Sequence, residues 1–141
     1  MIDIINLQRK VRFETGVFRK FSQLIAANVP EAADRRFSIA FVSDNRMKQL
    51  NHLFRGKNLT TDVLSFPHEP DEFDPDKTNL GNIVISAEQA QKQAAENGLT
   101  LEGEIKQLML HGLLHLCGYD HETDKGEMNA RELELRETLG I

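Results

Sequence analysis

Three histidines within eleven residues constrain this chain more than any other feature of its sequence. His111, His115 and His121 lie in the segment HGLLHLCGYDH, in which the first two are four residues apart and Gly118 precedes the third. Residues four apart on a helix share one face, with Cβ atoms about 5–6 Å apart. We therefore predict a helix that presents His111 and His115 on one side. Gly118, which tolerates positive φ, ends this helix and lets the chain turn back so that His121 approaches them.

Three imidazoles that converge in this way are typical of a metal site. Zinc with three protein ligands keeps a fourth position for water, and the ion lowers the pKa of that water to about 7. Imidazole also suits iron, nickel and copper, so other divalent transition metals are alternatives to zinc. A single histidine on an apolar helix is usually an ordinary core residue, but that reading does not explain the spacing. We predict one Zn²⁺ per chain, bound by His111, His115 and His121.

The same histidine spacing occurs in the metzincin proteases, whose pattern is H-E-x-x-H-x-x-G-x-x-H. Those enzymes carry their general base, a glutamate, directly after the first histidine, where this chain has Gly112. A peptidase without that carboxylate lacks its expected proton acceptor. Gly112 therefore speaks against a metallopeptidase or other amide hydrolase with the same zinc clamp, which stays an alternative with Glu122 as a substitute carboxylate.

Length and composition indicate an ordinary globular protein. The 141 residues, 40% hydrophobic and 28% charged, fit a single domain spanning residues 1–141. The one cysteine, Cys117, excludes an internal disulfide, and its position on the helix points it away from the metal face, as a structural residue. No apolar run approaches the roughly 18 residues of a membrane span, and the N-terminus lacks the layout of a secretion signal. We expect a cytoplasmic protein without a membrane partner.

The charges are distributed unevenly along the chain. Residues 1–60 carry 11 Lys/Arg against 5 Asp/Glu, a balance of +6, and residues 61–141 carry 6 against 17, a balance of −11, which gives the total of −5. The simpler interpretation is that both halves have solvated surfaces. The alternative is a basic region contributed by residues 1–60 that guides a phosphate backbone.

Segments with strand and helix periodicity alternate and predict an α/β (α+β) fold. Strands are expected at residues 2–7, 37–42, 62–66 and 80–85. Helices are expected at about residues 17–28, 44–54, 86–97, 100–117 and 123–139, with Asp44, Ser86 and Thr100 as N-caps and Gly98 as a stop. This order predicts a single mixed sheet of about four strands packed with about five helices, one of them the metzincin-like zinc helix.

Four segments together resemble the YbeY family of endoribonucleases, which mature ribosomal RNA. They are residues 54–57 (FRGK), 61–67 (TDVLSFP), 80–86 (LGNIVIS) and 111–121, and the similarity runs in the family's order from about Ser38 to Arg131. The resemblance implies a three-histidine zinc site and a single-strand-specific endoribonuclease for 16S rRNA 3′-end maturation and ribosome quality control. It also implies single-stranded RNA and the small ribosomal subunit with its proteins as partners.

The resemblance also implies a role for the R-G-K stretch. An arginine there is the functional partner of the metal in the family, and it corresponds to Arg55. A guanidinium binds the non-bridging oxygens of a phosphodiester in bidentate fashion, where charge gathers in the transition state. We predict that metal-bound water attacks the phosphodiester while Arg55 stabilises that charge, and that Lys57 adds a substrate contact. Without the resemblance, residues 55–57 read as a solvated turn.

The general base stays open at this point. The family usually has an aspartate where this chain has Asn82, and an amide accepts a hydrogen bond but takes no proton. Asp62 and Asp120 are alternative carboxylates, each more often a cap or turn residue. A further hypothesis is a noncatalytic ribosome-assembly factor whose metal only ties the last two helices together.

Overall fold

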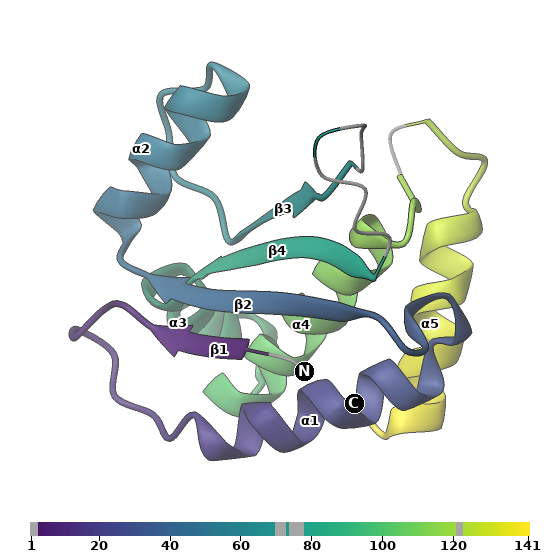
Figure 1. Cartoon of the computed structure of the whole chain (residues 1–141). Coiled ribbons are helices and arrows are strands. Elements are labelled where there is room, and N and C mark those ends of the chain that lie inside the picture. The colour runs from purple at the N-terminus through teal and green to yellow at the C-terminus, as the bar shows by residue number, and fades with distance from the viewer. Residues whose placement is uncertain (1–2, 70–72, 74–77, 121–122) are drawn as a thin grey trace.

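Figure 1 shows the computed structural model of the chain, which describes residues 3–69, 73, 78–120 and 123–141. Four strands form one sheet in the order β1-β2-β4-β3. β1, β2 and β4 are parallel, and β3 pairs with β4 in the antiparallel direction at one edge. The strands are β1 (Asp3–Asn6), β2 (Arg36–Val42), β3 (Val63–Pro67) and β4 (Asn79–Ser86).

Five α-helices and one 3₁₀ turn accompany the sheet. They are α1 (Gly16–Asn28), the 3₁₀ turn η1 (Pro30–Ala32), α2 (Asp44–Arg55), α3 (Ala87–Asn97), α4 (Leu101–Leu116) and α5 (Glu127–Leu139). The predicted fold class, one mixed sheet of four strands with five helices, is therefore confirmed. Among the helices of the described residues, none combines the length and the apolarity needed to cross a bilayer.

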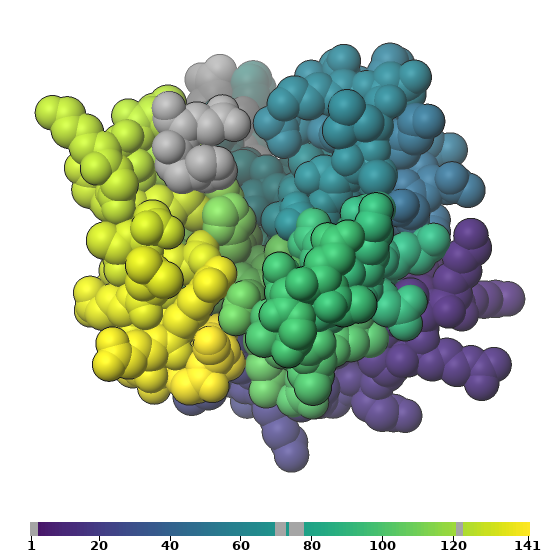
Figure 2. All heavy atoms as spheres, turned by 180° about the vertical axis from the view of Figure 1, so that it is seen from behind, coloured from purple at the N-terminus to yellow at the C-terminus, as the bar shows by residue number. Residues whose placement is uncertain are grey.

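The helix α4 is the centre of the hydrophobic core. It packs against β3 and β4 and also contacts α1, α3 and α5. Figure 2, which views the molecule from behind, shows α3 (green) and α5 (yellow) on the outside of the side that α4 covers. By contrast, α2 stands at the other end of the sheet from α5 (Figure 1). Side chains on α4 are therefore held by packing from several directions, whereas those at the end of α2 are exposed.

The alternation of side chains along β4 separates the two faces of the sheet. Ile83 and Ile85 are fully buried, and Ile83 lies against α4. Asn82 and Val84 point the other way, into a shallow apolar depression beside α2 that Leu50 and Phe54 also line. The sheet thus divides the molecule into a side with α4 and a side with α2.

Most predicted helix ends are confirmed, and two are corrected. The Ser86 and Thr100 hydroxyls accept the amides of Gln89 and Gly103, as the cap positions predicted. The cap of α2 is Ser43, whose Oγ accepts the amide of Arg46 at 3.2 Å, so the prediction of Asp44 as cap was wrong by one residue. Ser43 has the extended backbone that an N-cap requires, and Asp44 is already helical.

The start of the last helix is also corrected. α5 begins at Glu127 and not near residue 123. The carboxylate of Asp124 accepts the amides of Gly126 at 2.8 Å and Met128 at 2.9 Å. Gly126 has φ 105°, outside the helical region. A side-chain turn therefore occupies the residues in which the sequence pattern predicted the first helical turn.

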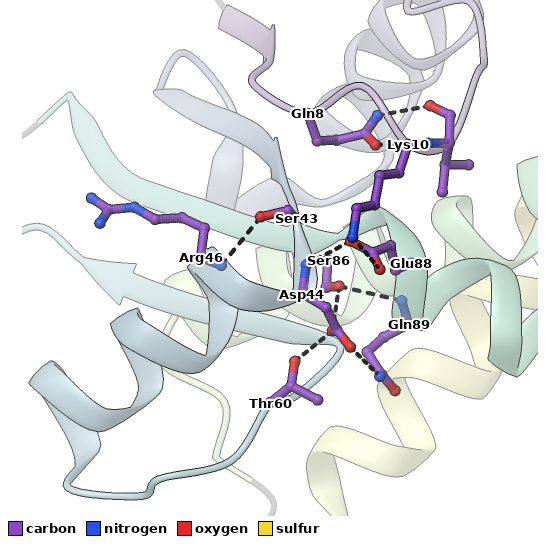
Figure 3. Close-up of polar contacts among 10 residues, drawn as sticks. Gln8, Lys10, Ser43, Asp44, Arg46, Thr60, Ser86, Glu88 and Gln89 are labelled. Atoms are coloured by element: carbon purple, nitrogen blue, oxygen red, sulfur yellow. Dashed lines mark hydrogen bonds and ion pairs between the residues drawn. The ribbon is translucent and has the colours of Figure 1, made fainter.

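The Asp44 carboxylate instead joins three segments, as Figure 3 shows. Its Oδ1 accepts the hydroxyls of Thr60 at 2.6 Å and Ser86 at 2.9 Å, and its Oδ2 accepts the Gln89 amide at 2.9 Å. Burial alone would raise the pKa of Asp44, but these hydrogen bonds outweigh it and the pKa is lowered. The Asp44 junction, formed by these four residues, fixes the start of α2 and the segment before β3 to the start of α3.

Candidate active site

A cleft of about 650 Å³ opens between the C-terminal end of α4 and the segment that joins α2 to β3. His111 and His115 line it on the α4 side, and Arg55 and Lys57 line it on the other side. Four of the five residues predicted to form the site therefore meet in one cleft. The fifth, His121, lies outside the described residues, as does Glu122.

The two histidines of α4 lie side by side. Their Nε2 atoms are 3.2 Å apart, and their ring planes cross at 77° with centroids 4.8 Å apart. Two nitrogens that share a tetrahedral zinc at 2.0–2.1 Å lie about 3.3 Å from each other, so the pair fits the ion. Within the described ranges, no group of three His, Cys, Asp or Glu side chains is gathered for a metal. The three-histidine site therefore stays a prediction that depends on His121.

The chain reversal after α4 is present as expected. Gly118 has φ 100°, a conformation that L side chains rarely adopt. The backbone amide of Gly118 donates to the carbonyl of His115 at 3.0 Å, and the amide of Tyr119 donates to the carbonyl of Leu114 at 3.1 Å. The Tyr119 hydroxyl donates to Glu31 at 3.0 Å, so the described start of the following segment is anchored to η1.

His111 has a partner from α5 that the sequence analysis missed. Its Nδ1 lies 2.6 Å from Oε1 of Glu132, which is only 8% exposed. The other oxygen of Glu132 accepts a hydrogen bond from Arg136. Burial by itself would raise the pKa of Glu132, but the hydrogen bond and charge of His111 and the charge of Arg136 outweigh it, so the pKa is lowered. One signal was present: Glu132 lies on the buried stripe of α5 defined by Met128 and Leu135.

Gly112 explains why the metzincin base is absent. A Cβ built on Gly112 would lie 2.7 Å from Cγ2 of Ile83, so α4 approaches β4 too closely for a side chain at this position. The carbonyl of Gly112 also accepts the Ser65 hydroxyl at 3.3 Å. A glutamate at residue 112 would point into the sheet, so this position could not supply the metzincin base, and the peptidase alternative depends on Glu122, which lies outside the described residues.

The residues considered for the general base lie in two places. Asp62 and Asp120 line the cleft. Oδ1 of Asp62 accepts a hydrogen bond from the backbone amide of Val63 at 2.8 Å. With the side-chain amide of Gln93 turned so that its nitrogen faces Asp62, that nitrogen donates to Oδ2 at 3.1 Å. Asn82 faces the opposite side of the sheet, where it accepts a hydrogen bond from Ser38. The departure from the family at residue 82 therefore lies outside the cleft.

Arg55 and Lys57 differ from the histidines in their surroundings. Both are exposed at the end of α2, where Gly56 with φ 68° ends the helix. Arg55 makes no ion pair within the part of the chain that the structure describes. The guanidinium is therefore available to an anion in the cleft.

Cys117 lies apart from the cleft, as its helix position predicted. It is half-buried and packs against the core. Burial, with a further contribution from the charge of Glu31, raises the pKa of its thiol to about 11. A thiol of this kind is neither a ready nucleophile nor a ready metal ligand.

Comparison with known proteins gives a consistent assignment. A family model described as "Endoribonuclease YbeY" matches residues 3–140. The chain is 48% identical over 108 residues to an Endoribonuclease YbeY of Nautilia profundicola, covering 77% of this chain and 75% of that protein. It is 40% identical to the Endoribonuclease YbeY of Koribacter versatilis, covering 98% and 86% of the two chains. The solution structure of TM1509 from Thermotoga maritima superposes with a TM-score of 0.66 at 29% identity, over 99% of this chain and 90% of that one. The chain belongs to the Endoribonuclease YbeY family.

Proposed function

We propose that this chain is a zinc-dependent endoribonuclease that cleaves single-stranded RNA in the cleft between α4 and the α2–β3 segment. The observation that carries the proposal is the placement of His111 and His115 opposite Arg55 and Lys57 in one cleft. Two imidazoles that can bind a metal and two cations that can bind phosphate together supply groups that support metal-assisted hydrolysis of a phosphodiester. Membership of an endoribonuclease family supports the same reaction.

The residues present fit zinc. The 3.2 Å spacing of the two Nε2 atoms suits a shared tetrahedral ion, and we propose His121 as the third ligand from the sequence spacing. Zinc bound there would supply a Lewis acid and a water molecule with a pKa near 7. His111 and His115 would orient the ion toward the cleft, because α4 holds their backbone in the core.

Arg55 and Lys57 would act on the substrate. Arg55 would bind the non-bridging oxygens of the scissile phosphate and stabilise the charge that develops on them. Lys57, two residues further, would contact a phosphate as a point charge. Asp62 and Asp120, also in the cleft, are the described carboxylates placed to accept a proton there.

We further propose 16S rRNA 3′-end maturation and ribosome quality control as the role, with the small ribosomal subunit as partner and the cytoplasm as location. The support for this step is the family membership and the four motifs that carry it. A chain with a single cysteine needs no oxidising compartment, which accords with that location.

The test combines metal analysis with RNA cleavage on the full chain. Zinc per chain is measured by elemental analysis, and cleavage is followed on a single-stranded oligoribonucleotide and on its duplex. We expect about one zinc per chain and cleavage of the single strand, and loss of both in His115→Ala. His52→Ala is the matched control, since His52 is exposed and lies outside the cleft lining.

Other outcomes decide between the hypotheses. Zinc bound without cleavage, also in the presence of small ribosomal subunits, would overturn the catalytic role and favour an assembly factor with a structural metal. A wild-type chain that binds no metal would overturn the zinc site. Equal cleavage by wild type and His115→Ala would remove the histidines from the reaction.

A further inference from the structure

We propose that Glu132 is a positioning residue that fixes the ring of His111 with its proton on Nδ1, so that Nε2 faces the metal. Arg136 in turn holds Glu132 in place. The inference deepens the proposed function, because the ion that it serves is the proposed zinc. It assigns to α5 a part in the site that neither the histidine motif nor the cleft lining contains.

The geometry at His111 assigns its two nitrogens different tasks. Nδ1 lies 2.6 Å from Oε1 of Glu132, a short distance for a charge-assisted hydrogen bond. Nε2 lies 3.2 Å from Nε2 of His115, on the side where the two imidazoles would share an ion. In a neutral imidazole one nitrogen carries the proton and the other has the free lone pair. A proton on Nδ1, donated to Glu132, therefore leaves the Nε2 lone pair for the metal.

The burial of Glu132 shows that this position is built into the fold. Glu132 is 8% exposed and lies between Met128 and Leu135, which face the core at 1% and 3% exposure. A carboxylate in such surroundings is costly unless each oxygen has a partner. One oxygen faces His111 and the other accepts from Arg136, one helical turn further along α5. The ion pair with Arg136 holds one carboxylate oxygen while the other faces His111 on α4.

A purely structural role for Glu132, as a tie between α4 and α5, makes a different prediction. A tie requires only that the two helices stay together, and the tautomer of His111 is then irrelevant. A positioning role requires that the proton of His111 moves when the carboxylate is removed, because the free imidazole side chain favours protonation of Nε2. The zinc affinity, read together with the tautomer of the metal-free protein, therefore distinguishes the two roles: a tie alone predicts that a folded variant keeps its affinity even when the tautomer changes.

The experiment compares Glu132→Ala, Glu132→Gln and the control Glu137→Gln, an exposed glutamate on the same helix. The zinc dissociation constant is measured by competition with a chelator, and the His111 tautomer by ¹⁵N-detected NMR of the metal-free chain in mildly alkaline buffer. We expect Glu132→Ala to bind zinc about 10- to 100-fold more weakly and to lose the Nδ1–H tautomer. Glu132→Gln keeps an oxygen that accepts from Nδ1, so we expect it to retain the tautomer and to recover part of the affinity. The control is expected to behave as wild type.

Two results would overturn the inference: unchanged zinc affinity in Glu132→Ala, or an unchanged His111 tautomer in the same variant. If Glu132→Ala does not fold, Arg136→Gln replaces it, since it leaves the carboxylate but removes the group that orients it. We then expect a smaller loss of affinity, about 3- to 10-fold, in the same direction. A wild-type chain that binds no zinc would overturn the metal site of the proposed function, and the tautomer of the metal-free protein would still show whether Glu132 fixes the proton of His111 on Nδ1.

Discussion

The two walls of the cleft are built in different ways. The histidine wall consists of His111 and His115 on α4, which packs against the sheet, and it is backed by Glu132 on α5, which packs against α4. The cation wall consists of Arg55 and Lys57, exposed at the end of α2. The two histidines are half-buried on a helix whose other faces lie in the hydrophobic core. The two cations follow the exposed end of α2, which the Asp44 junction holds at its start and the contacts of Asn51 with Leu59 and of Phe54 with Phe66 hold near its end.

This difference between the walls indicates in which of them the residues needed for function also contribute to the stability of the fold. A ligand pair for a metal must keep a spacing within a few tenths of an ångström, and core packing provides that precision. A phosphate-binding arginine works from an exposed position because its long side chain adapts to the substrate. We therefore expect substitutions in the histidine wall to change both folding and function, and substitutions in the cation wall to change function alone.

The largest effect is expected at Arg55, which tests the functional side of the comparison. Arg55→Ala should lower kcat/KM for single-stranded RNA about 100-fold, because a charge-stabilising donor is lost from the transition state. The free energy of unfolding should change by less than about 0.5 kcal/mol, since the side chain is exposed. The measurements are steady-state cleavage and urea denaturation, with Arg46→Ala, an exposed arginine of α2 outside the cleft lining, as control. Equal activity of the Arg55 and Arg46 variants would remove Arg55 from the reaction.

Gly112→Ala tests the structural side. Its Cβ would lie 2.7 Å from Cγ2 of the fully buried Ile83, so we expect a destabilisation of about 2 kcal/mol despite the better helix propensity of alanine. Chemical denaturation measures this difference. Gly16→Ala at the start of α1 is the control, since its added Cβ meets nothing within 4 Å. If both variants are equally stable, α4 and β4 are not in close contact at Gly112.

Asp44→Asn tests how much the Asp44 junction, at the end of α2 opposite the cation wall, contributes to the stability of the folded chain. The pKa of Asp44 is lowered from 3.8 in the folded chain, so its ionised form contributes stability that is complete above about pH 4. This contribution is lost as the pH falls through the lowered pKa of the folded state. At neutral pH we expect Asp44→Asn to be less stable by about 1–2 kcal/mol, because charge-assisted hydrogen bonds become neutral. Denaturation of both proteins at several pH values measures the difference, and a gap that stays constant into strong acid would contradict the assignment.

The smallest effect is expected at Cys117, which lies on α4's end but outside the histidine wall. Cys117→Ala should leave the zinc content unchanged and cost about 1 kcal/mol or less of stability. In the wild type, the thiol pKa of about 11 should make alkylation by iodoacetamide at neutral pH roughly 100-fold slower than for a free cysteine. Mass spectrometry of the alkylated protein measures the rate. Loss of zinc in Cys117→Ala would place the thiol among the ligands.

The features that the sequence predicted best depend on residues close together in the chain. The spacing of His111 and His115 led to two imidazoles on one helix face, and Gly118 led to the reversal after α4. The caps at Ser86 and Thr100 follow the same local rules. The error at the start of α2 has a nonlocal cause: Ser43 and Asp44 are both good caps, but the Asp44 carboxylate accepts hydrogen bonds from Thr60, Ser86 and Gln89, which lie far from it in the sequence.

The sequence by itself determined the alternation of strands and helices, the family motifs and the paired histidines, because side-chain periodicity and capping act within a few residues. Only the tertiary structure decided which side chains meet across long separations. In the tertiary structure Glu132 contacts His111, Arg55 lines the same cleft as the histidines, and Asn82 lies on the face of the sheet that is turned away from that cleft. The physical reason is that such contacts depend on how helices dock on the sheet, and the packing of buried side chains such as Ile83 against Gly112 sets that docking.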